Sequence, residues 1–402
     1  MRRGNQAGRF AFMLRNPWNF RLVRVHSDEF SPTVDNLAQE LVSGLDAAQP
    51  KVAYKPPRGG RFSADVKALA KRFRLHLITP AQLKITRKCA GQGFAFHSAT
   101  GKHIKDKKIL YRLNALAVPP AYEDVHYAAD PRAHIQAVGR DAAGRLQYRY
   151  HPDWEKVREA RKTAHLNDLI QVLPKIRRSI AQHLSGEQPT KEFALAAVIE
   201  LVGTAFIRAG SEEYAKEHGT RGAATLLKSN VKAENGKLVL RFRAKGSKLV
   251  EKEIESPRLC AVAEMLRALP GKRLFQYRDE AGEVHTVRAR DVNVFLREIA
   301  DCNISLKDFR TLCASAAVLE TLARAVPAGA VRTRKKQVLE ALRSAAEELK
   351  NTPAICRKSY VHDAVVTAFE DGVLERFAST LKSCRSPARK EQFLAQVLAT
   401  AA

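Results

Sequence analysis

Alternating apolar and polar residues characterise the chain from about residue 75 to residue 155. Residues 93–96 (Gly-Phe-Ala-Phe) and 146–150 (Leu-Gln-Tyr-Arg-Tyr) have the two-residue period of half-buried strands, and residues 99–102 and 140–144 have the composition of turns. The pattern therefore predicts a small, mainly antiparallel β-domain.

The strand at 146–150 has two chemically different faces. Gln147 and Arg149 share one face, and Tyr148 and Tyr150 share the other. One interpretation is that the polar face meets a ligand while the aromatic face packs. The other is an edge strand whose polar residues are simply solvated.

Beyond Trp154 the hydrophobic pattern becomes mostly helical. Residues 193–207 are strongly apolar, and residues 291–299 are a plausible further helix. Residues 332–350 carry an apolar face that is typical of core packing, made of Val338, Leu339, Leu342, Ala345, Ala346 and Leu349. After Gly372 we expect one or two peripheral helices.

One β-hairpin interrupts this helical half. Residues 237–243 alternate so that Leu238, Leu240 and Phe242 are buried, and residues 249–254 resume a strand pattern. Lys245 and Lys248 then lie at the hairpin tip. Together these patterns predict an α+β fold with a small β-rich domain at 75–155 and a larger, mostly α-helical domain at 156–402, whose core spans about 160–372.

The first 74 residues fit no repeat. Residues 1–27 hold six arginines and no acidic residue, which is compatible with a mitochondrial-type presequence, a basic DNA-binding arm or a poorly ordered extension. We favour the extension for 1–74, with a short helix at 31–48 and a linker at 55–60.

The overall charge points to a polyanionic partner. The chain has 69 Lys and Arg against 42 Asp and Glu, a formal net charge of +27. A merely basic protein, such as a ribosomal one, is the alternative. The six cysteines lack CxxC spacing, which argues against a zinc module or a disulfide scaffold and favours a reducing compartment. No apolar run is long enough to span a bilayer, and no export signal is apparent.

A tyrosine among cations is the first candidate for chemistry. Thr352 and Pro353 break a long helix, because proline lacks a backbone donor, and a short segment with Arg357, Lys358 and Tyr360 follows. A tyrosine hydroxyl, with an ordinary pKa near 10, needs positive charge or a base to attack at neutral pH.

Two arginines stand out upstream. Arg208 directly follows the apolar segment, so its guanidinium needs an anion, for which Glu200, Glu212 or a phosphate are candidates. Ser305 and Asp308 have the spacing of a capping box, which places Arg310 in the first turns of a helix, where phosphate is favoured.

The order of these groups resembles the type IB DNA topoisomerases, in particular their short bacterial and poxvirus-like branch. The resemblance runs from about Leu75 to Gly372 and rests on segments 118–122 (Val-Pro-Pro-Ala-Tyr), 134–141, 147–151, 206–210 (Phe-Ile-Arg-Ala-Gly), 244–248, 307–311 and 351–360.

The resemblance implies a catalytic set. Tyr360 would attack a DNA phosphodiester and form a 3′-phosphotyrosyl intermediate, while Arg208, Arg310 and Asn351 donate hydrogen bonds to the nonbridging oxygens. Lys248 would be the general acid on its hairpin, with Lys245 as the alternative, since Ala244 replaces the usual glycine. Many relatives have histidine in place of Asn351, and an amide can still donate a hydrogen bond.

The resemblance also implies the partner and its contacts. A monomer would clamp double-stranded DNA and relax supercoils without ATP or an obligatory metal, as a cytoplasmic, nucleoid-associated enzyme without cofactors. The expected DNA-contacting residues are Gln147, Tyr148, Arg149, Tyr150, Arg140, Tyr214 and Lys307.

Two rival functions use similar residues. A tyrosine recombinase has a similar Arg, Lys, Arg, Tyr set, but its second arginine usually follows a His-x-x-Arg pattern, whereas Lys307 precedes Arg310 here. A catalytically silent DNA-binding protein is the second rival, but every chemical position is filled by a workable residue.

Overall fold

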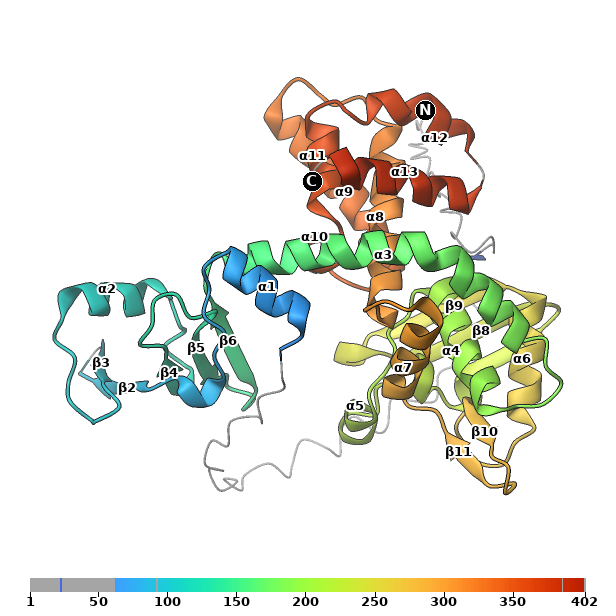
Figure 1. Cartoon of the computed structure of the whole chain (residues 1–402), viewed down its shortest axis with the longest axis horizontal. Coiled ribbons are helices and arrows are strands. Elements are labelled where there is room, and N and C mark those ends of the chain that lie inside the picture. Colours follow the sequence, from blue (N-terminus) through green and yellow to red (C-terminus); the bar gives the residue numbers. More distant parts are fainter. Residues whose placement is uncertain (1–21, 24–61, 92, 385, 401–402) are drawn as a thin grey trace, which may run out of the picture. The chain divides into compact units, whose positions relative to one another are not determined.

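The computed structural model describes residues 22–23, 62–91, 93–384 and 386–400 (Figure 1). These residues form two compact units, one of residues 62–162 and one of residues 163–400 together with 22–23. The helix predicted at 31–48 and the linker at 55–60 lie outside the described residues. The domain limits drawn from the sequence at 74/75 and 155/156 stay predictions.

The first unit is built on a five-stranded antiparallel sheet in the order β3-β2-β4-β5-β6. Its strands are β2 (Ile85–Ala90), β3 (Gly93–His97), β4 (Glu123–Tyr127), β5 (Ile135–Arg140) and β6 (Leu146–Tyr150). Its helices are α1 (Ala64–Arg72), the single 3₁₀ turn η1 (Pro80–Gln82) and α2 (Lys107–Ala115). The strands predicted at 93–96 and 146–150 are confirmed.

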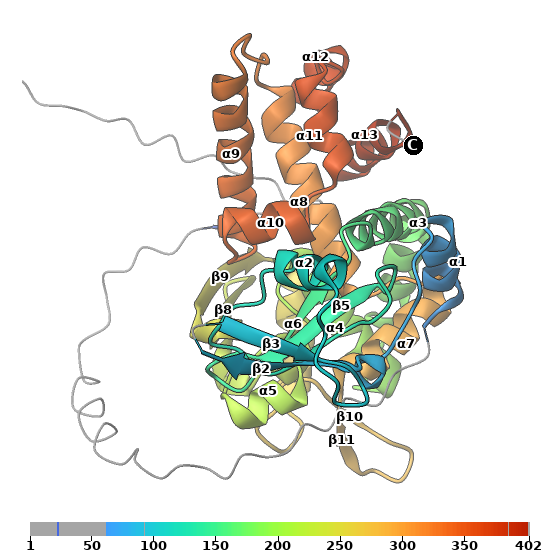
Figure 2. The same ribbon diagram turned by 90° about the vertical axis from the view of Figure 1, so that its left-hand side faces the viewer.

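Both faces of this sheet are packed. Helix α2 lies over one face (Figure 2) and buries Leu113 against Phe96, Tyr127 and neighbouring apolar residues. The other face holds a smaller cluster that includes Ile135 and Val138, against which Tyr148 packs. Apolar clusters therefore cover both faces of the sheet, and β6 is one of its edge strands.

The second unit is mostly helical, as predicted. Its helices are α3 (Trp154–His183, which begins in the first unit), α4 (Lys191–Ala205), α5 (Glu212–Glu217), α6 (Pro257–Arg267), α7 (Ala289–Ala300), α8 (Leu306–Ala323), α9 (Val331–Glu348), α10 (Pro353–Ser359), α11 (Asp363–Glu370), α12 (Glu375–Ser383) and α13 (Pro387–Thr400). None of the described helices is long and apolar enough to cross a membrane.

Two small sheets complete this unit. Strands β1 (Leu22–Val23), β7 (Val231–Glu234), β8 (Lys237–Arg243) and β9 (Leu249–Glu255) form an antiparallel sheet in the order β1-β9-β8-β7. Strands β10 (Gln276–Arg278) and β11 (Val284–Thr286) form a hairpin. Short 3₁₀ turns are η2 (Ala223–Thr225), η3 (Lys228–Asn230) and η4 (Lys245–Ser247). The predicted hairpin is thus β8–β9, with η4 at its tip.

Helix α4 lies at the centre of the second unit. Its residues from Phe193 to Ala205 are all buried, and it packs against α6, α7 and α8. A helix that is apolar on all sides is stable only when it is enclosed in this way. Phe206 ends α4 in the left-handed conformation, with φ of 53°, so the chain turns sharply just before Arg208.

Helix α9 differs in one respect from the sequence pattern. Val338, Leu342, Ala345 and Ala346 are buried as predicted, but Leu339 is 39% exposed, so its placement on the core face is wrong. At about 100° per residue, Leu339 lies on the same side of the helix as Ala346, at the edge of the apolar face. The buried face is therefore narrower than the apolar stripe of the sequence.

The end of α9 determines where Asn351 lies. The backbone N–H of Asn351 donates to Ala346 O (2.8 Å), and that of Lys350 donates to Glu347 O (3.1 Å). With Lys350 at φ of 51°, this is the Schellman arrangement, although glycine usually takes the left-handed position. Thr352 then caps α10 by accepting from the Ile355 N–H, which confirms the predicted helix break.

The N-terminal cap of α2 is expected to stabilise that helix in the first unit, which can be tested. Asp106 accepts hydrogen bonds from Lys108 N (2.8 Å) and Ile109 N (3.1 Å). Replacing Asp106 with Ala removes this cap, which typically stabilises a helix by about 1 kcal/mol. We expect the amides of residues 107–115 to exchange hydrogen about fivefold faster in the full chain. Asp106→Asn keeps an acceptor and serves as the control; equal exchange in the Ala variant and the control would contradict the assignment.

Candidate active site

Tyr360 is enclosed at the end of α10. Its backbone N–H donates to Cys356 O (3.0 Å), and the residue is only 9% exposed. The Arg310 guanidinium carbon lies 5.0 Å from the centroid of the phenol ring, and the Lys307 ammonium nitrogen lies 6.0 Å from it. The phenol therefore faces two cations from α8.

These cations change the acidity of the phenol. Burial by itself raises the pKa of Tyr360, but the charges of Arg310, Arg208 and Lys307, together with a hydrogen bond from Arg310, outweigh it. The pKa of Tyr360 is consequently lowered from its ordinary value of about 10. Such a hydroxyl loses its proton more readily than an ordinary tyrosine.

The cations that act on Tyr360 are not the adjacent ones that drew attention in the sequence. Arg357 forms an ion pair with Asp363, and Lys358 is exposed. Arg357 is thus held by a carboxylate, and the charges that lower the pKa of Tyr360 belong to Arg310, Arg208 and Lys307, which are distant in the sequence.

Arg310 holds two distant chain segments together. It is 3% exposed, and its Nη1 and Nη2 donate to the carbonyl oxygens of Phe206 and Leu349, the latter at 3.0 Å. The capping box predicted for α8 is present, with Ser305 N donating to Asp308 Oδ2 (2.8 Å). The first turns of α8 thus place the guanidinium between the ends of α4 and α9.

Arg208 and Asn351 come together across this junction. Nη2 of Arg208 donates to Oδ1 of Asn351 at 2.6 Å. A guanidinium has only donors, so the atom that faces it must be the amide oxygen, and the NH₂ group of Asn351 must point elsewhere. The side chain of Asn351 is thereby oriented by Arg208.

Two buried donors in this cluster lack a hydrogen-bond partner among the described residues. They are Nε of Arg310 and Nδ2 of Asn351. More than nine in ten buried polar groups in proteins are paired, so unpaired donors of this kind require an explanation. Arg310 lies against the Tyr360 ring and Asn351 is held by Arg208, so both unpaired donors belong to the cluster around Tyr360.

The carboxylates considered for Arg208 have other partners. Glu200 pairs with Arg258 at 3.1 Å, and Glu212 pairs with Arg273. These two carboxylates, the alternatives to a phosphate as the anion for Arg208, are therefore engaged by other arginines. Each is held by a cation nearer to it in the fold, so the positive charge of Arg208 stays available.

The two hairpin lysines are both exposed at the tip of β8–β9. The Lys245 ammonium lies 5.8 Å from the centroid of the Tyr214 ring, a cation–π distance, and Tyr214 is 46% exposed. Ala244 adopts φ of −96°, whereas the left-handed positions of the tip are Gly246 and Ser247. Alanine at position 244 is therefore compatible with the tip conformation.

Ser315 contacts the backbone around Tyr360, a role that the sequence did not indicate. This buried residue of α8 donates to Tyr360 O (3.2 Å) and accepts from His362 N (3.1 Å). It fixes the backbone around Tyr360 to the same helix that carries Arg310. A lone serine in an apolar helix gives no signal in a sequence, because it is usually a neutral packing residue.

Three of the residues expected to contact DNA in the first unit form hydrogen bonds within that unit. Nε2 of Gln147 donates to Asp141 Oδ2 (2.9 Å), and Nη2 of Arg149 donates to Ala117 O (3.0 Å). Nη1 of Arg140 donates to Gly144 O at 2.9 Å. Gln147 and Arg149 line one hollow with Val118, Tyr122 and Gly139. Tyr148 and Tyr150 stack with ring centroids 5.9 Å apart.

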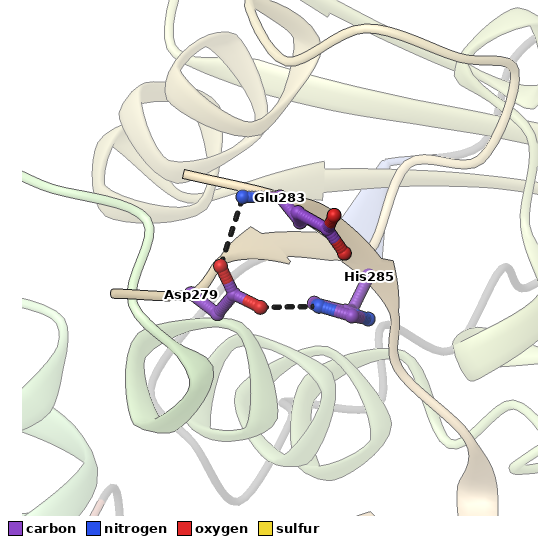
Figure 3. Close-up of side chains that lie close together, drawn as sticks. All are labelled: Asp279, Glu283 and His285. Atoms are coloured by element: carbon purple, nitrogen blue, oxygen red, sulfur yellow. Dashed lines mark hydrogen bonds and ion pairs between the residues drawn. The ribbon is translucent and has the colours of Figure 1, made fainter. Parts of the chain in front are cut away.

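One cluster of possible metal ligands lies elsewhere, in the β10–β11 hairpin. Side-chain ligand atoms of Asp279, Glu283 and His285 lie within 4.8 Å of one another (Figure 3). Asp279 accepts from His285 Nε2 (2.6 Å) and from Glu283 N (2.8 Å). Both carboxylate oxygens thus close the turn, which accounts for the cluster without an ion.

The chain matches known families over most of its length. Residues 148–386 match the family described as eukaryotic DNA topoisomerase I, catalytic core, and residues 93–141 match the bacterial DNA topoisomerase IB, N-terminal domain. DNA topoisomerase 1B of Acanthamoeba polyphaga mimivirus is 30% identical over 295 residues, which cover 71% of this chain and 88% of the viral protein. DNA topoisomerase 1 of Rabbit fibroma virus (strain Kasza) is 24% identical over 230 residues, 57% of this chain and 70% of that protein.

A tyrosine close to several cations, together with unpaired buried donors, makes this cluster the candidate active site. The family matches specify its class: the chain belongs to the type IB DNA topoisomerases. It is an isomerase whose substrate is DNA, and the recombinase alternative is set aside. The family resemblance found in the sequence is confirmed.

The lowered pKa of Tyr360 can be tested by titration. Replacing Lys307 with Met removes one of the cations, so the pKa of Tyr360 should rise. Absorbance difference between each protein and its Tyr360→Phe counterpart isolates this phenol, and Lys335→Met, an exposed position on α9, controls for the loss of one lysine. The folded chain loses this proton before the unfolded chain does, so the ionisation adds stability only as pH rises toward 10. An unshifted titration in Lys307→Met would contradict the assignment.

Proposed function

We propose that Tyr360 is the nucleophile of two reversible transesterifications. The phenol oxygen attacks a DNA phosphorus, the bond from phosphorus to the 5′ oxygen breaks, and the enzyme is left joined to the 3′ phosphate. After the free end has rotated, the 5′ hydroxyl attacks the same phosphorus and releases Tyr360. The phosphodiester bond energy is kept in the covalent link, so neither step needs ATP.

The observation that supports this proposal most directly is the pair of unpaired buried donors in the cluster around Tyr360. Nε of Arg310 and Nδ2 of Asn351 lack partners among the described residues. A phosphate oxygen would satisfy each of them, and the negative charge that develops on these oxygens would strengthen both bonds. Arg208 contributes in two ways, because it adds charge and it orients the amide of Asn351.

We assign the proton for the leaving 5′ oxygen to a lysine of the β8–β9 hairpin. Lys248 is our first choice and Lys245 the alternative. Both are exposed at the tip, where the DNA backbone can reach them. The contact between Lys245 and Tyr214 supports a role for that lysine in holding the hairpin tip in place. Lys248 is then the lysine that donates the proton.

We further propose that one copy of the chain encloses the duplex as a clamp. The formal net charge of +27 favours this association, because the release of counterions from DNA drives the binding of basic proteins. Gln147, Arg149 and Arg140 would face the DNA from the first unit, and Tyr214 and Lys307 from the second. Such an enzyme would act in the cytoplasm, on the nucleoid.

The nucleophile is tested by relaxation of negatively supercoiled plasmid in EDTA without ATP. We expect the wild-type protein to relax the plasmid and to leave a covalent adduct on a denaturing gel. Tyr360→Phe should do neither, because the ring is kept but the attacking oxygen is absent. A folded, DNA-binding wild-type protein that fails to relax DNA would overturn the proposed mechanism. Relaxation by Tyr360→Phe would overturn the choice of nucleophile.

The general acid is tested by comparing Lys248→Met with Lys245→Met. Loss of a general acid typically slows the chemical step by about 10²–10⁴-fold. We expect Lys248→Met to show such a loss in the single-turnover rate of adduct formation at saturating DNA. Lys245→Met should lose less, and mainly through DNA affinity. A larger loss of rate in Lys245→Met than in Lys248→Met would assign the general-acid role to Lys245.

A further inference from the structure

A lysine occupies an inward position of strand β9. Lys252 lies opposite Leu240 of β8 and shares its face of the strand with Val250 and Ile254, all of which are in the core. The Lys252 side chain is only 7% exposed. An ammonium group in such surroundings is costly unless it is paired and hydrogen-bonded, so its partners are informative.

The two partners of the Lys252 ammonium are residues at the ends of two helices, and the segments that follow these helices enter the candidate active site. The ammonium donates to Ala205 O at 2.7 Å and forms an ion pair with Glu348. Ala205 is the last residue of α4, and Arg208 follows it. Glu348 is the last residue of α9, and Asn351 follows it. One side chain of the hairpin therefore holds both segments.

Arg310 makes an equivalent link one residue further along each segment. It donates to the carbonyl oxygens of Phe206 and Leu349. The two cations thus join the same pair of chain ends at adjacent positions. Lys252, Glu348, Arg208 and Arg310 also line a single narrow cavity. Lys252 differs from Arg310 in that its charge is neutralised by a carboxylate.

Both chain ends adopt conformations that need external support. Phe206 has φ of 53° and Lys350 has φ of 51°. Residues other than glycine adopt this left-handed conformation at a cost, so contacts made by the neighbouring residues help to maintain it. Without the Lys252 contacts, the backbone at each chain end can relax to a more favourable conformation. Such a change would displace Arg208 or Asn351.

We propose that Lys252 and Glu348 form a positioning pair for the transesterification site, an inference that rests on the proposed function. The pair touches neither the phosphate nor the phenol. It sets the separation between the segments that carry Arg208 and Asn351, and it joins both to the hairpin that carries Lys248. A displacement of about 1 Å in such groups can slow a reaction by about 10²-fold.

The test uses the full chain and compares Lys252→Met with Glu251→Gln. Methionine keeps most of the volume of Lys252 and removes its charge. Glu251 is the adjacent residue of β9, and its exposed ion pair with Arg241 (3.0 Å) contacts neither chain end. We measure the single-turnover rate of adduct formation on supercoiled plasmid at saturating enzyme, and separately the DNA affinity in a Tyr360→Phe background.

For Lys252→Met we expect a rate about 10²-fold below wild type, with unchanged DNA affinity and with the protein folded at the assay temperature. Glu251→Gln should match wild type. The double variant Lys252→Met/Glu348→Gln should be no slower than Lys252→Met, because partners that act as one unit have non-additive effects. A merely stabilising pair would lower the melting temperature and leave this rate intact.

The outcomes separate this inference from the proposed function. If the wild-type protein forms no covalent adduct, the proposed function itself is contradicted. If the wild type reacts and Lys252→Met reacts equally fast, or loses only DNA affinity, the positioning role is overturned. Should Lys252→Met fail to fold, Glu348→Gln, which changes one charged oxygen to an amide, carries the test, and a wild-type rate in that variant counts against the pair.

Discussion

The second unit depends above all on one buried cation. Arg310 is nearly inaccessible to water, and it replaces its hydration with the carbonyl oxygens of Phe206 and Leu349. Because a buried guanidinium without such partners would be strongly unfavourable, the ends of α4 and α9 are obliged to meet at α8. Tyr360 is attached to the same helix through Ser315, so the proposed nucleophile and the cation nearest its ring share one support.

Around this centre, acidic groups are placed so that they do not cancel the positive charge of the site. Glu200 is held by Arg258, Glu212 by Arg273, and Glu348 by Lys252. Arg208, Arg310 and Lys307 are consequently the groups that act on the phenol of Tyr360. The same arrangement suits a type IB topoisomerase, whose substrate supplies the missing negative charge when a phosphodiester enters.

Much of the fold could be predicted from local patterns. The strand at 146–150, the hairpin with its two tip lysines, the capping box of Ser305 and Asp308 and the break at Pro353 all depend on residues close together in the chain. The expectations that differ from the structure concern contacts between residues of different helices or segments. Leu339 has the apolar character of a core residue, but its exposure depends on which neighbours cover that side of α9. Arg357 is adjacent to Tyr360 in sequence and pairs with Asp363 instead.

The candidate reactive groups Arg208, Arg310, Asn351 and Tyr360 could be proposed from the sequence, because side-chain chemistry and short motifs are properties of the chain alone. How those groups contact one another was not. Arg208 meets Asn351 across 143 positions, and Arg310 meets Phe206 across 104. Each pairing results from competition among many charged and polar groups for partners in a low-dielectric interior, and only the packed helices determine which of them come within hydrogen-bonding distance.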